Sequence, residues 1–598
     1  MRRGHAENLV GELYDELVYV AFQATPVRLG RHRRVLVAHA VVQRLPRQVE
    51  RAVAQVPPAE LFGLVVKAAL SAGDARQRVR IRGLRFFPMT DAPEPLQLEE
   101  ALHREPPEVR VAWALRQRAG LDDDAVRRIL AAAGVADTTA VLSAAGHVAL
   151  PPEQLFDPCA VKLAPEWNRS RSRLVLALPL ILIAGCLVAW GVSHDPAEVT
   201  SSRPTGSSVE SQTVTAGFRA APANLWRSTS KLDFAAWSPR GELAGDTQIQ
   251  SRVWQFWQQG KQVTTAPGTS PVAPAEPPAL LYAGRVAGAV VVLVYDGTRV
   301  GRYTEVGGAQ SLRLDRVDSA DLMTSAAIAV SRTPQGTRYV LAPWIAAAAV
   351  RDLAVPAGTS RPLEVAGGLT AAVPGGGAGC RSRFVLELRS SPAVAEKHAF
   401  VLADLGNLVP AHLTYMPLPA DGTARSPREV LSTEARISWA LHACTLDGWH
   451  DAGTRLINNW AFAEQKLPTG GTARWSCLRV DAWSGQGLAT VRLEPPSGPA
   501  VPVGTSVGTS ACSRFSQNIA AATVWRAPTR QSYVLAAGSR HVTGLVLRTN
   551  RGRQAVTSPV AVPLVRGTTV TGLQARLANG KTFEGMTGPA TGRAGGSR

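Results

Sequence analysis

The sequence lacks the patterns that mark several common classes of protein. Its first 22 residues, MRRGHAENLVGELYDELVYVAF, have charged and polar side chains where a secretory signal would need an unbroken apolar core, so we expect no signal peptide. PGGGAGC at 374–380 lacks the Lys-Ser/Thr ending of a phosphate-binding loop. GTSVG at 504–508 fits Gly-x-Ser-x-Gly, but its flanks indicate a turn-rich loop rather than the strand and helix around a nucleophilic serine.

The sequence also lacks a complete set of metal ligands. His442, Cys444 and His450 lie close together in sequence, but a fourth ligand is missing and Cys444 is a better candidate for a disulfide. The sequence therefore predicts no catalytic residue, no metal and no cofactor, and we expect that the protein is not an enzyme.

What the chain does contain is enough material for several folded units. It has 598 residues, 45% of them hydrophobic, whereas single domains cluster near roughly 100–200 residues. Only 7 of its 65 basic residues are lysine, and with its many alanines and glycines the chain resembles a protein from a GC-rich, actinobacterial-type genome.

One stretch is long and apolar enough to predict a transmembrane helix. Residues 174–192, LVLALPLILIAGCLVAWGV, hold nineteen uncharged positions, and a helix of that length spans about 28 Å, close to the apolar thickness of a bilayer. A buried core helix is the alternative. Four basic residues lie in the fifteen before the stretch and one in the fifteen after it. This asymmetry predicts a single-pass protein of the cell membrane, with its N-terminus cytoplasmic and residues 195–598 extracytoplasmic.

This topology divides the net charge of +19 unevenly. Residues 1–173 contain 25 basic and 20 acidic side chains (+5), which leaves 40 basic and 26 acidic (+14) for the remainder. A basic outer part predicts contact with an anionic envelope polymer or with lipid head groups, although such an excess also serves solubility. The outer part holds four disulfide candidates, enough for one or two bridges: Cys380, Cys444, Cys477 and Cys512.

Residues 1–150 predict an all-α cytoplasmic domain from their three- and four-residue apolar spacing. Within it we expect one helix over 109–118, ended by Gly120. Carboxylates at 122–124 would begin a second helix and Gly134 would end it. A third helix, over about 137–145, would complete a helix-turn-helix.

This region resembles the extracytoplasmic-function sigma factors. The C-terminal part of the resemblance is carried by Pro106, Pro107, Val109, Arg110, Leu115, Gly120, Leu121, Val126, Ile129, Leu130, Gly134 and Val135. The N-terminal part is carried by YDELVYVAF at 14–22 and AHAVVQRL at 38–45. The resemblance implies contact with RNA polymerase or another regulator through residues 1–150.

The sequence departs from that family where function would depend on it. His39 and Ala40 replace the family's acidic pair, and residues 137–145 contain no Arg, Lys, Asn or Gln to contact bases. The remaining candidates for weak phosphate contact are Arg116, Arg118, Arg127 and Arg128. We therefore do not expect specific DNA binding; a fold kept for protein contacts, a working DNA binder and an unrelated helical bundle are the three alternatives.

The rest of the chain predicts linkers and a β-rich domain. We expect a basic juxtamembrane linker (151–173), a flexible linker (193–222), a small Trp-rich unit (223–260), a Pro-rich linker (261–278), an all-β domain that is a sandwich or propeller (279–587) and a disordered tail (588–598). In the β domain, Asp296-Gly297 predicts a hairpin turn.

The predicted function is a membrane regulator or sensor that couples an extracytoplasmic binding domain to a sigma-like interaction module. The alternatives are a membrane-tethered transcription factor and an envelope-associated structural or binding protein.

Overall fold

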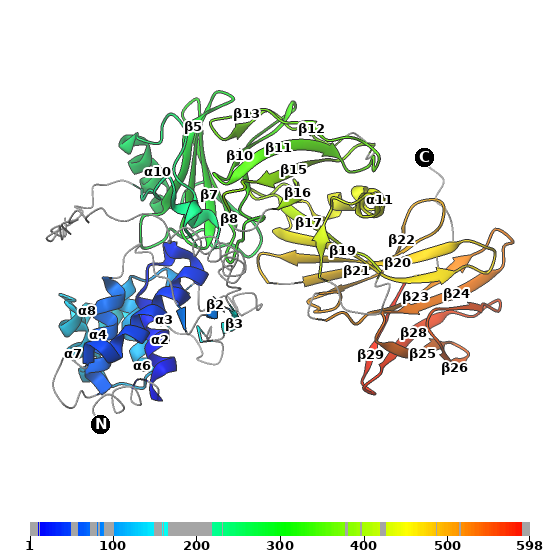
Figure 1. Ribbon diagram of the computed structural model, residues 1–598, viewed down its shortest axis with the longest axis horizontal. Helices are drawn as coiled ribbons and strands as arrows, with labels where there is room; N and C mark the ends of the chain where they lie inside the picture. Colours follow the sequence, from blue (N-terminus) through cyan, green and yellow to red (C-terminus); the bar gives the residue numbers. More distant parts are fainter. Residues whose placement is uncertain are drawn as a thin grey trace, which may run out of the picture.

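The computed structural model shows an N-terminal helical unit, a large β unit and a C-terminal β-sandwich (Figure 1). Strands make up more of the described residues than helices do. The structure describes residues 10, 12–49, 58–71, 80–81, 84–88, 101–148, 158–159, 161–165, 218–229, 231–376, 381–394, 398–418, 426–485, 487–513 and 516–588.

The helical unit packs its helices around one apolar core that includes Leu17, Val65 and Trp113. Its helices are α2 (Tyr14–Ala24), η1 (Val27–Leu29), α3 (Gly30–Val49), α4 (Pro58–Leu70), α6 (Pro107–Gln117), α7 (Asp123–Ala133) and α8 (Thr138–Gly146). It also contains an antiparallel sheet of β1 (Arg80–Ile81), β2 (Leu84–Pro88) and β3 (Val161–Pro165). The prediction of an all-α, sigma-like domain is therefore wrong, because residues 161–165, expected in a linker, pair with 84–88.

Helices α7 and α8 each begin at an aspartate whose side chain caps the helix. Asp122 accepts a hydrogen bond from the Ala125 N–H at 2.7 Å, and Asp137 accepts one from the Ala140 N–H at 2.9 Å. Gly134 ends α7 with φ of 94°, a left-handed conformation that glycine adopts without strain. Local capping chemistry is thus enough to set these boundaries.

The β unit begins with a five-stranded sheet whose two faces are both covered. Its strand order is β4 (Val263–Thr265), β8 (Ala309–Arg316), β7 (Arg299–Val306), β6 (Ala289–Tyr295) and β5 (Ala279–Val286). Helix α10 (Thr247–Gln259) packs Val253 and Trp257 against one face, and Trp237 packs against the other. Because β4 pairs with β8 and α10 covers the sheet, the Trp-rich and Pro-rich segments belong to this unit.

Two further sheets complete the β unit. A four-stranded sheet has the order β13 (Val365–Ala366), β14 (Leu369–Thr370), β10 (Gly336–Leu341) and β9 (Ala327–Thr333). The largest sheet follows the order β12 (Arg361–Pro362), β11 (Ile345–Asp352), β15 (Phe384–Ser390), β16 (Ala399–Ala403), β17 (Ala411–Met416), β19 (Thr454–Lys466), β20 (Thr472–Ala482), β21 (Gly487–Glu494) and β22 (Val501–Val507), with β18 (Arg428–Glu429) beside β17. Helix α11 (Thr433–Ala440) lies in the crossover between the parallel strands β17 and β19.

The C-terminal sandwich consists of an inner and an outer sheet. The inner sheet has the order β27 (Val560–Pro563), β24 (Ser532–Gly538), β23 (Ala520–Arg526) and β30 (Met586–Thr587). The outer sheet has the order β26 (Gly552–Val556), β25 (Val542–Thr549), β28 (Val570–Leu577) and β29 (Thr582–Glu584). Ala521 and Leu535 pack toward the large sheet, whereas Ala522 and Val534 pack toward the outer sheet. The inner sheet is therefore the middle layer of three, and the outer sheet lies at the far end of the molecule (Figure 1).

The helical unit contacts the β unit directly. Arg28 forms an ion pair with Glu276 at 2.9 Å, and Arg33 donates to the Thr229 hydroxyl at 2.9 Å. These two segments were predicted to lie on opposite sides of a membrane, which such contacts rule out. The predicted span 174–192 lies outside the described residues, and none of the described helices is long and apolar enough to cross a bilayer. The prediction of a single-pass membrane protein, with its localisation, is therefore wrong.

Candidate anion-binding site in the C-terminal sandwich

Acidic residues are almost absent from the C-terminal end of the chain, so the basic residues there are left unbalanced. After Glu494 the sequence contains twelve basic side chains and a single acidic one, Glu584. The basic residues are Arg514, Arg526, Arg530, Arg540, Arg548, Arg551, Arg553, Arg566, Arg576, Lys581, Arg593 and Arg598. The charge excess of the chain is therefore not diffuse, and its distribution within the sandwich indicates where an anion would bind.

Three loops meet at one end of the sandwich. They are the turn 527–531 after β23, the turn 550–551 after β25 and the loop 564–569 after β27. The Leu564 N–H donates to the Ser532 carbonyl at 2.8 Å, which joins the first and third loops. The Asn550 N–H donates to the Thr569 carbonyl at 3.1 Å, and the Asn550 amide donates to the Gly567 carbonyl at 3.0 Å. The three loops thus support one another.

These loops, with the strand ends beside them, carry five exposed arginines, here called the basic end: Arg526, Arg530, Arg551, Arg553 and Arg566. Arg551 Nη2 donates to the Arg566 carbonyl at 2.7 Å, which ties this side chain to the third loop. Residues 526–531, 549–553 and 564–569 contain no carboxylate. Because guanidinium groups form paired hydrogen bonds with oxyanions, this cluster has the chemistry of an anion site.

The pairing of β25 with β26 adds a like-charge contact at this end. Arg548 and Arg553 lie directly opposite one another in the outer sheet. Like charges in this position destabilise a sheet unless a counterion lies between or near them. Arg548 is neutralised by an ion pair with Glu584, while Arg553 forms no ion pair within the described residues. Arg553 therefore keeps an unneutralised charge that an external anion could pair with.

The solvent-facing side of the outer sheet continues this charge. Leu545, Leu547 and Leu573 point inward to the sandwich core. On the opposite side, which we call the outer face, Arg548 lies opposite Gly572 and Arg576 lies opposite Gly544. A Cβ at Gly572 would come 2.8 Å from Arg548 Nε, which shows that this side chain lies flat across β28.

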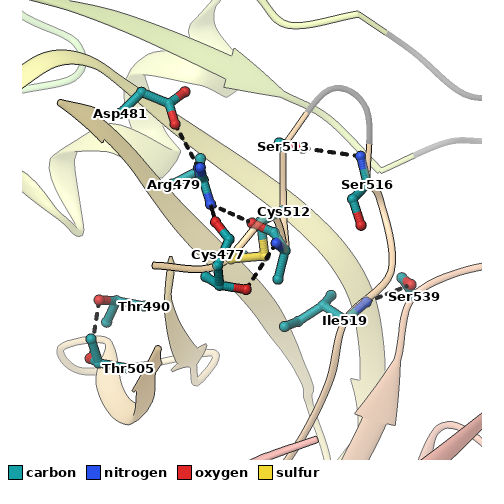
Figure 2. Close-up of a disulfide and its surroundings, with 12 residues drawn as sticks. Cys477, Arg479, Asp481, Thr490, Thr505, Cys512, Ser513, Ser516, Ile519 and Ser539 are labelled. Carbon is teal, nitrogen blue, oxygen red and sulfur yellow. Dashed lines mark hydrogen bonds and ion pairs between the residues drawn. A yellow bond between two sulfur atoms is a disulfide. The ribbon is translucent and has the colours of Figure 1, made fainter. Parts of the chain in front are cut away.

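A disulfide holds the sandwich to the β unit (Figure 2). Cys477 of β20 is bonded to Cys512, in the segment that leads into β23. Beside it, Arg479 donates from Nε to Asp481 at 2.7 Å (Figure 2). Its Nη1 donates to the Ala511 carbonyl at 3.1 Å. The bond and the arginine together fasten the approach to the sandwich. Of the other candidates, Cys444 is also disulfide-bonded and Cys380 lies outside the described residues.

The four arginines proposed for phosphate contact in the helical unit are a weaker site. Arg116 pairs with Asp123 at 2.7 Å and Arg127 pairs with Asp124 at 2.5 Å. Arg118 lies 6.0 Å from the Tyr19 ring centroid, and Arg128 is exposed. The aspartates at the start of α7 thus neutralise two of the four charges.

The structure separates the other motifs of the sequence. Ser506 lies within β22, paired with Ala489, rather than at a strand-to-helix turn. His442 is buried and pairs with Glu494 at 2.8 Å, whereas His450 is exposed beside Asp451. Among the described residues, no group of three or more His, Cys, Asp or Glu side chains is arranged to hold a metal.

A cavity of about 40 Å³ lies at the junction of the helical and β units. Its lining includes His103, Arg299, Arg316 and Asp296. Burial, and then Arg34 nearby, lowers the pKa of His103 well below 6.5, so this imidazole is neutral near pH 7. Arg299 is paired with Asp296 at 2.7 Å, and Arg316 with Asp318 at 2.5 Å. Two of the three arginines that line this cavity are thus neutralised, and the third, Arg104, donates to the Ser270 hydroxyl at 3.0 Å. The cavity therefore has less unneutralised charge than the basic end.

From the sequence we assigned the basic excess of +14 to residues 174–598 as a whole, whereas +11 of it lies after Glu494. The signal was available as a local count of acidic residues after Glu494. The sequence does not show that the three loops meet, because the hydrogen bonds between them connect residues up to 33 positions apart. No protein family, no curated protein and no solved structure matches this chain.

Proposed function

We propose that the protein binds an anionic polymer through the basic end of its C-terminal sandwich. The observation that carries this proposal is the set of five exposed arginines in and beside three mutually bonded loops that contain no carboxylate. This proposal develops the alternative of an envelope-associated structural or binding protein.

The shape of the site favours a polymer over a small metabolite. The five arginines are spread over an exposed loop surface, whereas small-molecule sites are concave and bury most of the ligand. A polymer with repeated charges can engage several such arginines at once, so that weak individual contacts add up. The disulfide and Arg479 fasten the sandwich that carries this surface to the large β unit.

The proposal can be tested by measuring the affinity of the full chain for inorganic polyphosphate. The triple substitution Arg551→Ala, Arg553→Ala and Arg566→Ala should weaken binding about tenfold or more, which corresponds to about 1.4 kcal/mol. Raising the salt concentration should weaken wild-type binding strongly, because ion pairing supplies most of the affinity.

A matched control removes three exposed arginines elsewhere: Arg128→Ala, Arg285→Ala and Arg338→Ala. It changes the net charge by the same amount but leaves the sandwich intact, so it should bind nearly as well as the wild type. Equal losses in the two triple variants would show that only the overall charge matters and would refute a localised site.

A further inference from the structure

We infer that the ligand is a linear, base-free polymer of repeating oxyanions, which runs from the basic end onto the outer face along the strands. This inference rests on the proposed function and adds the class of the ligand and its path. It depends on the continuity of two groups of arginines that belong to different parts of the sandwich.

Arg553 connects the two groups. It follows the turn that carries Arg551, and it lies opposite Arg548 on the outer face. Farther along the sheet, Arg576 lies opposite Gly544, four residues before Arg548 on β25. At about 3.4 Å per residue, the two positions are separated by about 14 Å along the strand. The cationic groups therefore form a track, because they follow one strand direction instead of converging on a point.

The outer face between these arginines carries few bulky side chains. Gly544 and Gly572 have no side chains, and Arg548 lies across Gly572 toward Glu584 on β29. Gln574 lies in the same row, opposite Val546, and offers an amide donor. A chain lying on this face would meet guanidinium groups at both ends and would cross the row of Val546 and Gln574 between them, where Gln574 offers its amide.

The outer face has no platform for nucleic-acid bases. Single-stranded nucleic acids are bound in large part by stacking bases on aromatic side chains. The described residues that share this face are Gly544, Val546, Arg548, Arg553, Ala555, Gly572, Gln574, Arg576, Thr582 and Glu584, and none is aromatic. Charge and hydrogen bonding are the interactions available here, which favours a polymer without bases.

Glu584 gives the track a feature that can be tested by a gain of affinity. It is the single carboxylate after Glu494, and it occupies Arg548. A polymer on the outer face must either displace this carboxylate or lie beside it. Glu584→Gln should therefore strengthen binding of a long polymer, since it frees Arg548 and removes a negative charge from the path.

The experiment compares triphosphate with long polyphosphate on the full chain. The ratio of the two affinities should fall about fivefold in Arg576→Ala, the loss expected for one exposed charge contact of about 1 kcal/mol. The ratio should rise in Glu584→Gln. A thymine oligonucleotide of matched charge should bind more weakly than polyphosphate.

The outcomes separate this inference from the proposed function. If neither phosphate probe binds, the proposed function fails. If both bind and the ratio is unchanged in both variants, binding is confined to the basic end, so the track is refuted while the proposed function stands. Tighter binding of the oligonucleotide would overturn the base-free assignment.

Discussion

Replacing Gly297 with alanine should loosen the junction between the helical and β units. Gly297 lies in the turn between β6 and β7 with φ of 103°, and a Cβ added there would come 2.0 Å from the Val27 carbonyl oxygen. The contact is between two backbones, so no flexible side chain can move aside. Gly288, in the turn between β5 and β6, has φ of 81° and no atom within 4 Å of an added Cβ. It is therefore a matched control for backbone strain.

The magnitude follows from the difference between these two turns. Forcing alanine into the left-handed region costs roughly 1–2 kcal/mol at either position. At Gly297 the overlap with Val27 adds a packing penalty of about 1–3 kcal/mol. We expect Gly288→Ala to lower the free energy of unfolding by about 1–2 kcal/mol and Gly297→Ala by about 2–5 kcal/mol.

Denaturant unfolding and amide hydrogen exchange together measure this effect. In Gly297→Ala, amide protection should fall around residues 27–34, which contact the β unit, while Gly288→Ala should leave protection there unchanged. Equal destabilisation and equal protection in the two variants would show that the helical unit is not docked through this turn.

Three further measurements test other parts of the fold. Cys512→Ala opens a loop of 35 residues and should lower the free energy of unfolding by about 3–4 kcal/mol. Burial lowers the pKa of His32 and of His103 well below 6.5 in the folded protein. Unfolding therefore takes up protons as the pH falls below about 6.5, and stability should decrease in that range; a flat profile from pH 7 to pH 5 would contradict this, and His103→Gln should reduce the slope. Buried Arg110 donates to the carbonyls of residues 23, 25 and 105 at 2.8–2.9 Å. Because lysine cannot reach three acceptors in this geometry, Arg110→Lys should lose about 2–4 kcal/mol in thermal or denaturant unfolding, and wild-type stability would show that these bonds contribute little.

The parts of the fold that sequence could predict are those set by neighbouring residues. Asp122 and Asp137 begin their helices, Gly134 ends one, and Asp296-Gly297 forms a turn. Each depends on chemistry within about four residues, which a sequence displays directly.

The predictions that failed depended on contacts between distant residues. The all-α prediction missed the pairing of 161–165 with 84–88, which no local pattern reveals. The prediction that the two parts lie on opposite sides of a membrane was based on the apolar stretch 174–192. A hydropathy profile does not reveal the ion pair between Arg28 and Glu276, which are 248 residues apart in the chain. The candidate site is a mixed case, because its charge could be counted from the sequence but the meeting of its loops could not.

The middle position of the inner sheet limits how this protein could be rearranged by evolution or by engineering. Ile519, Ala521, Leu535 and Ala537 are all buried toward the large β unit. Cutting the chain in a loop before the sandwich would expose this apolar surface to water. The free-energy cost would be about 25 cal/mol for each Å² exposed. The sandwich could therefore not be transferred to another protein by itself. It would have to be moved together with the sheet that it packs against, or the apolar residues on its inner surface would first have to be replaced with polar ones.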